Sequence, residues 1–173
     1  MAVGSSTAAQ PGERELVITH VFDAPRDLVW KTFTESDHLD HWWGPKGFTA
    51  HVHKLELRPG GVFFYCQKTP DGREMYGKWV YREVVPPERL VIVSSFTDDK
   101  ENLVRHPLSP NWPLEMLGTS TFTENQGRTT LTIRTRPINA TESECKTFYD
   151  AKSSMEQGFA GTFDRLDEYL ASL

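Results

Sequence analysis

Histidine pairs are the residues of this sequence whose spacing could bind a metal ion. His38 and His41 lie three residues apart on an expected helix, and His51 and His53 would project from one face of an expected strand. Zinc sites in proteins use three or four ligands at recognised spacings. Neither pair has a third ligand at such a spacing, and an exposed histidine is common, so the sequence predicts no metal and no cofactor.

The cysteines and acidic residues offer few groups for catalysis. Cys66 and Cys145 match neither a disulfide framework nor a zinc-ligand spacing, so we interpret both as buried thiols. The sequence has no glycine-rich phosphate loop, no His-Glu-x-x-His and no Gly-x-Ser-x-Gly motif. Acid or base chemistry on a bound ring or ester would need a titratable group in a pocket, for which Glu83, Glu115 and His106 are the candidates.

A strand and two short helices are expected at the start of the fold. Residues 15–22 are β-branched and aromatic, which favours a strand. Pro25 suits the first turn of a helix with an apolar face. A second short helix carries Trp42 and Trp43, which point about 100° apart, and it ends at a Gly-Pro pair.

Turn sequences rich in proline, glycine and asparagine divide the middle of the chain into strands. The strand-like runs are residues 50–57, 62–67, 74–84, 90–96, 117–123 and 129–135. Consecutive strands joined by tight turns pair antiparallel. With residues 15–22 they predict one antiparallel sheet of about seven strands.

Residues 98–115 break this pattern. Three prolines interrupt any regular element, yet several large apolar side chains are present. Such a segment is typical of a lid or binding loop, and equally of a loop that only packs.

The C-terminal segment has a helical period. Apolar side chains recur at spacings of seven, four, four, three, four and three: Phe148, Met155, Phe159, Phe163, Leu166, Leu170 and Leu173. Thr141 and Glu144 form a capping-box pattern, which predicts one helix from Thr141 to Ala171, roughly 45 Å long. Its apolar stripe must be covered by the sheet.

Composition limits the classes of partner. The net charge of −5 is spread without a basic cluster, which argues against a nucleic-acid partner. The sequence has no secretory signal and no apolar run of about twenty residues, so we expect no membrane span and a cytoplasmic location. Residues 1–12 are small and polar, which predicts a flexible tail before a single domain of residues 13–173.

Five short motifs, spread from Val21 to Leu173, carry a family resemblance. They are Phe22-Asp23-Ala24-Pro25 with Val29-Trp30, Trp42-Trp43-Gly44-Pro45, Leu57-Arg58-Pro59-Gly60-Gly61, Pro86-Pro87-Glu88-Arg89-Leu90, and Gly158-Phe159 leading into Leu166 and Leu170. In order and spacing they resemble the family named for the C-terminal domain of the activator of heat-shock protein 90 ATPase, in the START-like, birch-pollen-allergen-like superfamily. The resemblance implies an α+β helix-grip fold, in which a curved antiparallel sheet wraps a long C-terminal helix.

The resemblance also implies a cavity between sheet and helix. The leading hypothesis is therefore binding of a small, largely apolar ligand, such as a lipid, a polyketide or an aromatic compound. The candidate wall residues are large apolar side chains on elements expected to face inward: Trp42, Phe64, Trp79, Phe96, Trp112, Met155, Phe159 and Phe163. A register error of one residue would reverse the facing of a whole strand.

One lysine interrupts the apolar stripe of the last helix. Counted at 100° per residue from Phe159, Lys152 falls only about 20° from the centre of the stripe. Its ammonium group either extends to water at the end of the sheet or anchors an acidic ligand head group in the cavity.

Two other functions belong to the same superfamily. A cyclase or hydrolase would use the same cavity with a titratable group inside it. A co-chaperone would stimulate the heat-shock protein 90 ATPase through its surface. The eukaryotic activator has a second, N-terminal domain that also engages the chaperone, for which these 173 residues leave no room, so co-chaperone activity is the least expected.

Overall fold

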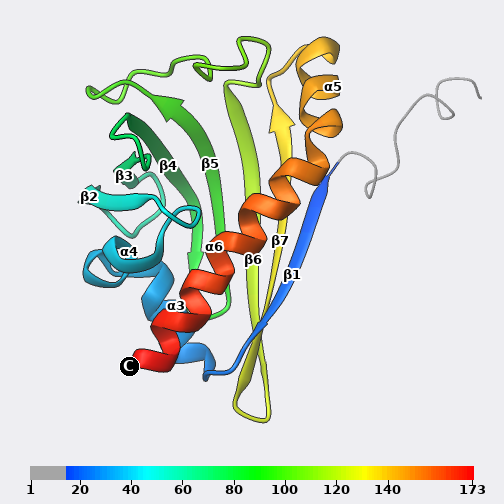
Figure 1. Cartoon of the computed structure of the whole chain (residues 1–173). Coiled ribbons are helices and arrows are strands. Elements are labelled where there is room, and N and C mark those ends of the chain that lie inside the picture. The colour runs from blue at the N-terminus through cyan, green and yellow to red at the C-terminus, as the bar shows by residue number, and fades with distance from the viewer. Residues whose placement is uncertain (1–14) are drawn as a thin grey trace, which may run out of the picture.

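The structure, a computed structural model, describes residues 15–173 (Figure 1). In chain order its elements are β1 Leu16–Phe22, α3 Arg26–Thr34, α4 Ser36–Trp42, β2 Thr49–Leu55, β3 Val62–Lys68, β4 Glu74–Val85, β5 Arg89–Thr97, β6 Glu115–Asn125, β7 Arg128–Ile138, α5 Glu142–Asp150 and α6 Lys152–Ser172. The expected flexible tail of residues 1–12 lies outside the described residues.

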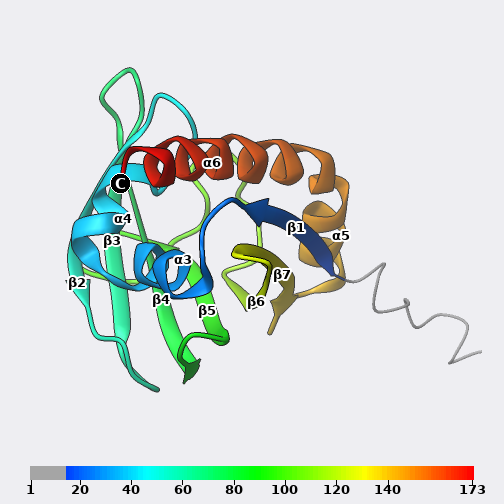
Figure 2. The ribbon, with the colours of Figure 1, turned by 90° about the horizontal axis from the view of Figure 1, so that it is seen from below.

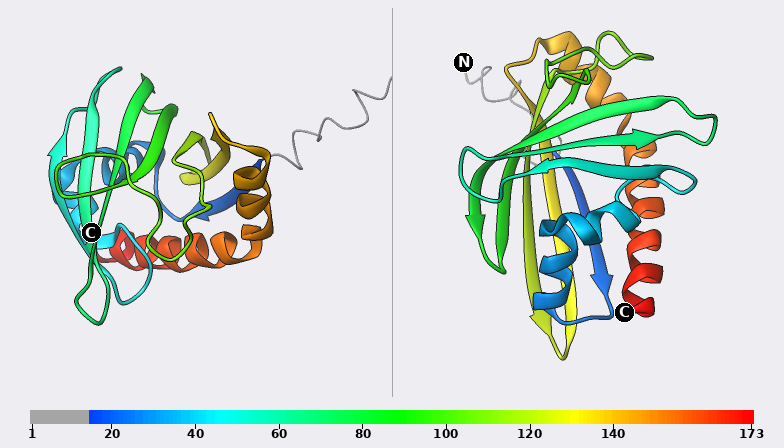
Figure 3. Two further views of the ribbon diagram at one scale, coloured as in Figure 1. Left: turned by 90° about the horizontal axis from the view of Figure 1, so that it is seen from above. Right: turned by 90° about the vertical axis from the view of Figure 1, so that its left-hand side faces the viewer.

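The seven strands form one sheet in the order β1-β7-β6-β5-β4-β3-β2, and all neighbouring strands are antiparallel. The sheet curves around α6, which lies across its open side (Figure 2). The short helices α3 and α4 lie at one end of the curved sheet, and the loop between β5 and β6 crosses the other end (Figure 3). The predicted α+β helix-grip fold is confirmed.

The C-terminal helix differs from the prediction, because it is two helices rather than one. The capping box at Thr141 is present: the Glu144 backbone N–H donates to Thr141 Oγ1 at 3.1 Å, and the Thr141 N–H donates to Glu144 Oε1 at 2.9 Å. The helix then breaks at Ala151, where φ is −90° and ψ is 6°. Just before the break, Phe148 of α5 packs against Trp112, with ring centroids 5.7 Å apart. Among the described helices none is long and apolar enough to cross a membrane.

The core lies under the C-terminal half of α6. Its largest buried side chains come from the sheet, from α3 and α4, and from α6, and they include Phe22, Phe33, Trp42, Phe63, Phe122, Phe163 and Leu166. Each fully buried ring or leucine contributes about 1.5–3 kcal/mol relative to exposure. The guanidinium of Arg165 fastens α6 to the end of α4, because its Nη1 donates to the carbonyl oxygens of Gly44 and Pro45 at 2.9 and 3.0 Å. This packing leaves the N-terminal half of α6 above unfilled space.

Candidate ligand-binding cavity

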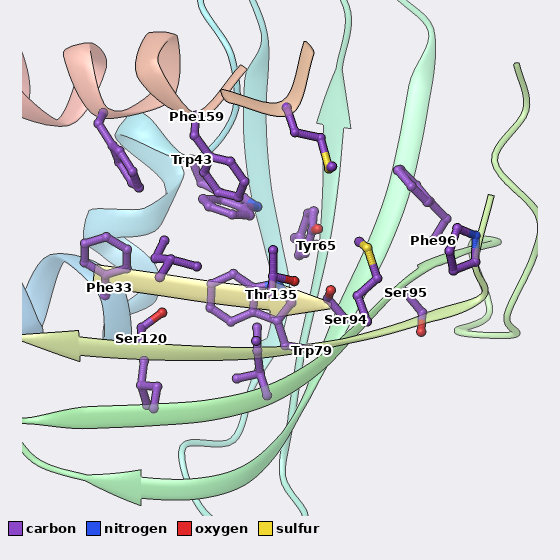
Figure 4. Close-up of a pocket in the computed structure, with 18 of the residues that line it drawn as sticks. Phe33, Trp43, Tyr65, Trp79, Ser94, Ser95, Phe96, Ser120, Thr135 and Phe159 are labelled. Atoms are coloured by element: carbon purple, nitrogen blue, oxygen red, sulfur yellow. The ribbon is translucent and has the colours of Figure 1, made fainter. Parts of the chain in front are cut away.

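A cavity of about 180 Å³ lies between α6 and the concave face of the sheet (Figure 4). Six of the expected wall residues line it: Trp79, Phe96, Trp112, Met155, Phe159 and Phe163. The other lining residues were not expected: Phe33, Trp43, Tyr65, Leu90, Ile92, Ser94, Ser95, Pro113, Met116, Gly118, Ser120, Ile133 and Thr135. The cavity wall is therefore formed by the sheet, by the helices and by the loop before β6.

Strand alternation builds the floor of the cavity. Side chains two residues apart share one face of a strand. In β5 the inward set is Leu90, Ile92, Ser94 and Phe96, in β6 it is Met116, Gly118 and Ser120, and in β7 it is Ile133 and Thr135. The floor is apolar, with a few hydroxyl groups set into it.

Trp42 does not line the cavity, contrary to expectation. Its side chain is fully buried in the core, where its Nε1 donates to the Thr32 carbonyl oxygen at 2.9 Å and its ring packs on Phe33. The adjacent Trp43 lines the wall instead. Neighbouring residues at a helix end point in different directions, so only one of the pair can reach the cavity.

Phe64 does not line the cavity either, because β3 faces the other way. Its ring stacks with Tyr76 and packs near His53, on the opposite side of the sheet, with centroid separations of 5.8 and 5.4 Å. The inward residues of β3 are its neighbours Phe63, in the core, and Tyr65, in the cavity wall. The facing assumed for this strand was wrong by one residue.

Lys152 is not among the lining residues. It is the first residue of α6, one turn before Met155, and it is partly exposed. It makes no ion pair with any residue in the described range 15–173. The helical period cannot show where along the helix the cavity ends.

The three candidate acid or base groups also lie outside the cavity. Glu83 pairs with Arg89, and Glu115 accepts a hydrogen bond from Asn139 Nδ2 at 3.2 Å. His106 lies behind the wall, with its ring 4.8 Å from that of Phe96. Burial lowers the pKa of His106, and its Nδ1 accepts a hydrogen bond from the Leu108 N–H at 3.0 Å.

Tyr65 is the titratable side chain that does reach the cavity wall within the described part of the chain. Its ring lies over Gly77, its partner across β3 and β4, and a Cβ built at Gly77 would come within 2.6 Å of the Tyr65 hydroxyl oxygen. Burial raises the pKa of Tyr65 to about 12, while the nearby Trp43 N–H acts in the opposite direction. The hydroxyl is therefore neutral at physiological pH, and glycine at position 77 makes its placement possible.

Several polar atoms of the wall have no partner within the protein. The indole Nε1 atoms of Trp43 and Trp112 are buried and make no hydrogen bond in the described structure. The hydroxyl groups of Ser94, Ser120 and Thr135 also make none with residues 15–173. Buried donors are almost always satisfied by protein, water or ligand, so the two indole N–H groups are candidates for a hydrogen bond to a ligand or a water molecule.

The loop of residues 98–114 closes one end of the cavity with Trp112 and Pro113. It is tied to α5 by an ion pair between Arg105 and Glu144. Asn111 Nδ2 adds hydrogen bonds to the oxygen atoms of Ser143 and Thr147, at 2.7 to 3.1 Å. The loop is thus an ordered wall of the site.

The histidine pairs do not converge with other ligands. His38 Nδ1 lies 2.6 Å from the Tyr169 hydroxyl, and the His51 and His53 rings pack against each other with centroids 4.7 Å apart. No group of three His, Cys, Asp or Glu side chains among residues 15–173 is placed to hold a metal ion.

A curved seven-stranded sheet around a long helix, with an apolar cavity between them, defines a helix-grip domain of the START-like class. The family model described as activator of Hsp90 ATPase homolog 1-like protein matches residues 23–171, and the chain belongs to this family. No curated protein matches the chain in sequence.

Several solved structures share the fold. Protein Ms6760 from Mycobacterium smegmatis is similar at 26% identity, with a TM-score of 0.76 and coverage of 94% of each chain. A protein from Arthrobacter aurescens is 24% identical, with a TM-score of 0.79 over 96% of this chain and 91% of that one. Protein NE0264 from Nitrosomonas europaea is 23% identical, with a TM-score of 0.74 over 93% of this chain and 96% of that one.

Proposed function

We propose that the protein binds a small, largely apolar ligand in the cavity between α6 and the sheet. The supporting observation is the cavity wall itself: it is built from aromatic and aliphatic side chains with a few hydroxyl and indole groups, and no acidic, basic or histidine side chain of residues 15–173 is part of it. Such a composition is typical of ligand pockets, in which a few polar groups orient an apolar body.

The volume of the cavity sets the size of that ligand. An engineered apolar cavity of about 150 Å³ in another protein binds benzene. At about 180 Å³, this cavity accommodates a molecule of one aromatic ring with a small substituent. A lipid chain or a multi-ring polyketide exceeds this volume.

Binding is favoured over acid–base catalysis by the positions of the candidate groups. Glu83 and Glu115 lie outside the cavity, and His106 is separated from it by Phe96 and Trp112. A general acid or base must reach its substrate within hydrogen-bonding distance. Tyr65, with its raised pKa, is a hydrogen-bonding group rather than a base.

A cavity-filling substitution tests this function. A Cβ built at Gly118 would meet Ile92 Cγ1 at 3.5 Å and Thr135 Oγ1 at 4.0 Å, which are ordinary contacts. The further carbons of Gly118→Leu would therefore fill cavity space without forcing the backbone. Thr119→Leu places the same side chain on the opposite face of β6 and is the matched control.

The measurement is mass spectrometry of small molecules that co-purify with the native protein. We expect the same apolar compound from the wild type and Thr119→Leu, and its loss from Gly118→Leu at unchanged secondary structure. A compound that stays bound to Gly118→Leu in full amount would place the ligand outside this cavity and contradict the proposal.

A further inference from the structure

The indole N–H of Trp43 is an unpaired donor in the cavity wall. Trp43 Nε1 is buried and makes no hydrogen bond within residues 15–173. Trp43 packs edge-on against Tyr65, with ring centroids 5.7 Å apart and planes at 90°. The N–H is near enough to favour ionisation of the Tyr65 hydroxyl, yet the geometry is not that of a hydrogen bond. An indole N–H can only donate, so what is missing here is an acceptor.

The Tyr65 hydroxyl makes this end of the cavity a two-group polar site. Figure 4 shows Trp43 and Tyr65 next to each other on the wall, below Phe159 of α6. Tyr65 is held there because Gly77 leaves room for its ring. A neutral phenol can donate a hydrogen bond or accept one. An acceptor atom placed between the two groups could receive hydrogen bonds from both.

The charge of the wall restricts the ligand further. No cationic or anionic side chain within residues 15–173 lines the cavity, and Lys152 lies beyond its end. A carboxylate or an ammonium group in this space would lose its hydration without gaining an ion pair. The cavity is therefore built for an uncharged molecule.

We propose that the cavity selects an uncharged aromatic ligand with a carbonyl oxygen, which accepts a hydrogen bond from the Trp43 indole N–H beside the Tyr65 hydroxyl. This inference rests on the proposed function, because it names the ligand class of the same cavity. It replaces the expectation of an acidic head group anchored by Lys152. The apolar body of the ligand lies between Phe159 and the floor formed by β5, β6 and β7.

Three probes of nearly equal shape separate the parts of this proposal. Acetophenone carries the carbonyl oxygen, α-methylstyrene replaces that oxygen with a CH₂ group, and benzoate replaces the methyl group with a second, charged oxygen. Binding is measured by NMR of protein labelled at the methionine methyl groups. Met116 and Met155 line the cavity and report occupancy, and Met75, which is not among the lining residues, is the internal reference.

Trp43→Phe removes the N–H and keeps an aromatic ring. For each protein variant we compare the affinity for acetophenone with the affinity for α-methylstyrene, as a ratio. The two ligands differ in hydration, but this difference is the same for every variant and cancels when the ratios are compared. A neutral hydrogen bond contributes a factor of about five, so Trp43→Phe should lower the ratio about fivefold. Trp30→Phe, a core substitution away from the cavity wall, should leave the ratio unchanged. At neutral pH benzoate should bind at least about 100-fold more weakly than acetophenone.

The outcomes are distinct. If Trp43→Phe leaves the affinity ratio unchanged, the carbonyl oxygen does not accept a hydrogen bond from Trp43. If the ratio falls in Trp112→Phe instead, the oxygen lies at the loop end of the cavity. Either result would overturn the proposed hydrogen bond. Benzoate binding within tenfold of acetophenone would overturn the selection of uncharged ligands. In each of these cases the proposed function still stands. If neither acetophenone nor α-methylstyrene shifts Met116 and Met155, the proposed function fails, and this inference fails with it.

Discussion

Gly77 should be intolerant of even a single methyl group. In Gly77→Ala the new Cβ would lie 2.6 Å from the Tyr65 hydroxyl oxygen and 2.7 Å from Cζ, although carbon atoms in contact are about 3.5–4.0 Å apart. Tyr65 must move, and overpacking of this kind costs about 1–3 kcal/mol. Replacement of a strand glycine by alanine otherwise gains about 0.5–1 kcal/mol. We therefore expect a net loss of about 1–2 kcal/mol in the free energy of unfolding.

The same substitution at Gly158 is the control. A Cβ there meets nothing within 4 Å, and Gly158 lies inside α6, so Gly158→Ala should stabilise the protein by up to about 1 kcal/mol. The assay is urea unfolding of both variants. In a Tyr65→Leu background the cost of Gly77→Ala should disappear, because the clashing ring is gone. If Gly77→Ala proves as stabilising as Gly158→Ala, Tyr65 does not lie across Gly77 and the described cavity wall is wrong.

Two further predictions concern α6 and the loop that closes the cavity. Phe163 is 1% exposed and borders both core and cavity, so Phe163→Ala should lower the free energy of unfolding in urea by about 3–5 kcal/mol. Phe159→Ala should lower it by about half as much, because one side of the Phe159 ring faces open space. Equal costs would mean that no open space lies beside Phe159. The backbone N–H of Thr141 and the guanidinium of Arg105 lower the pKa of Glu144, so its stabilising contribution is present above the ordinary value of 4.5 and is lost as the pH falls through the depressed pKa. Thermal unfolding of Glu144→Gln should therefore depend less on pH below 4.5 than that of the wild type, and an identical dependence would contradict this role.

The fold could be predicted because its signals are local. Proline and glycine turns separate the strands, and a period of three to four residues marks α6. The break at Ala151 could not be predicted, because alanine is the best helix former and nothing at that position signals an end. Next to the break Phe148 packs on Trp112, a residue of a distant loop, and a contact of this kind leaves no local signal in the sequence. Leu173, expected on the apolar stripe, is 57% exposed and follows the last residue of α6, Ser172.

The cavity could be predicted only in part, because facing depends on strand register. In β3 the run Val62 to Cys66 is apolar on both faces, so it has no alternation from which to tell Phe64 from Tyr65. The glycine at position 77 was an available signal, because a glycine inside a strand often marks a close approach of another group. Small floor residues such as Ser94 and Gly118 could not be predicted, because nothing in their size or polarity distinguishes them from surface residues of a strand.

The most direct test of the cavity as a ligand site is a crystal structure of the protein soaked in iodobenzene. Its ring is close in size to the cavity, and the anomalous signal of iodine gives its position without reference to any assumed ligand. We predict one strong iodine peak between Phe159 and the floor residues Ser94 and Thr135, and the loss of this peak in Gly118→Leu. A cavity that stays empty while iodine binds only at the surface, for example beside the exposed Leu108, would contradict a ligand site between α6 and the sheet.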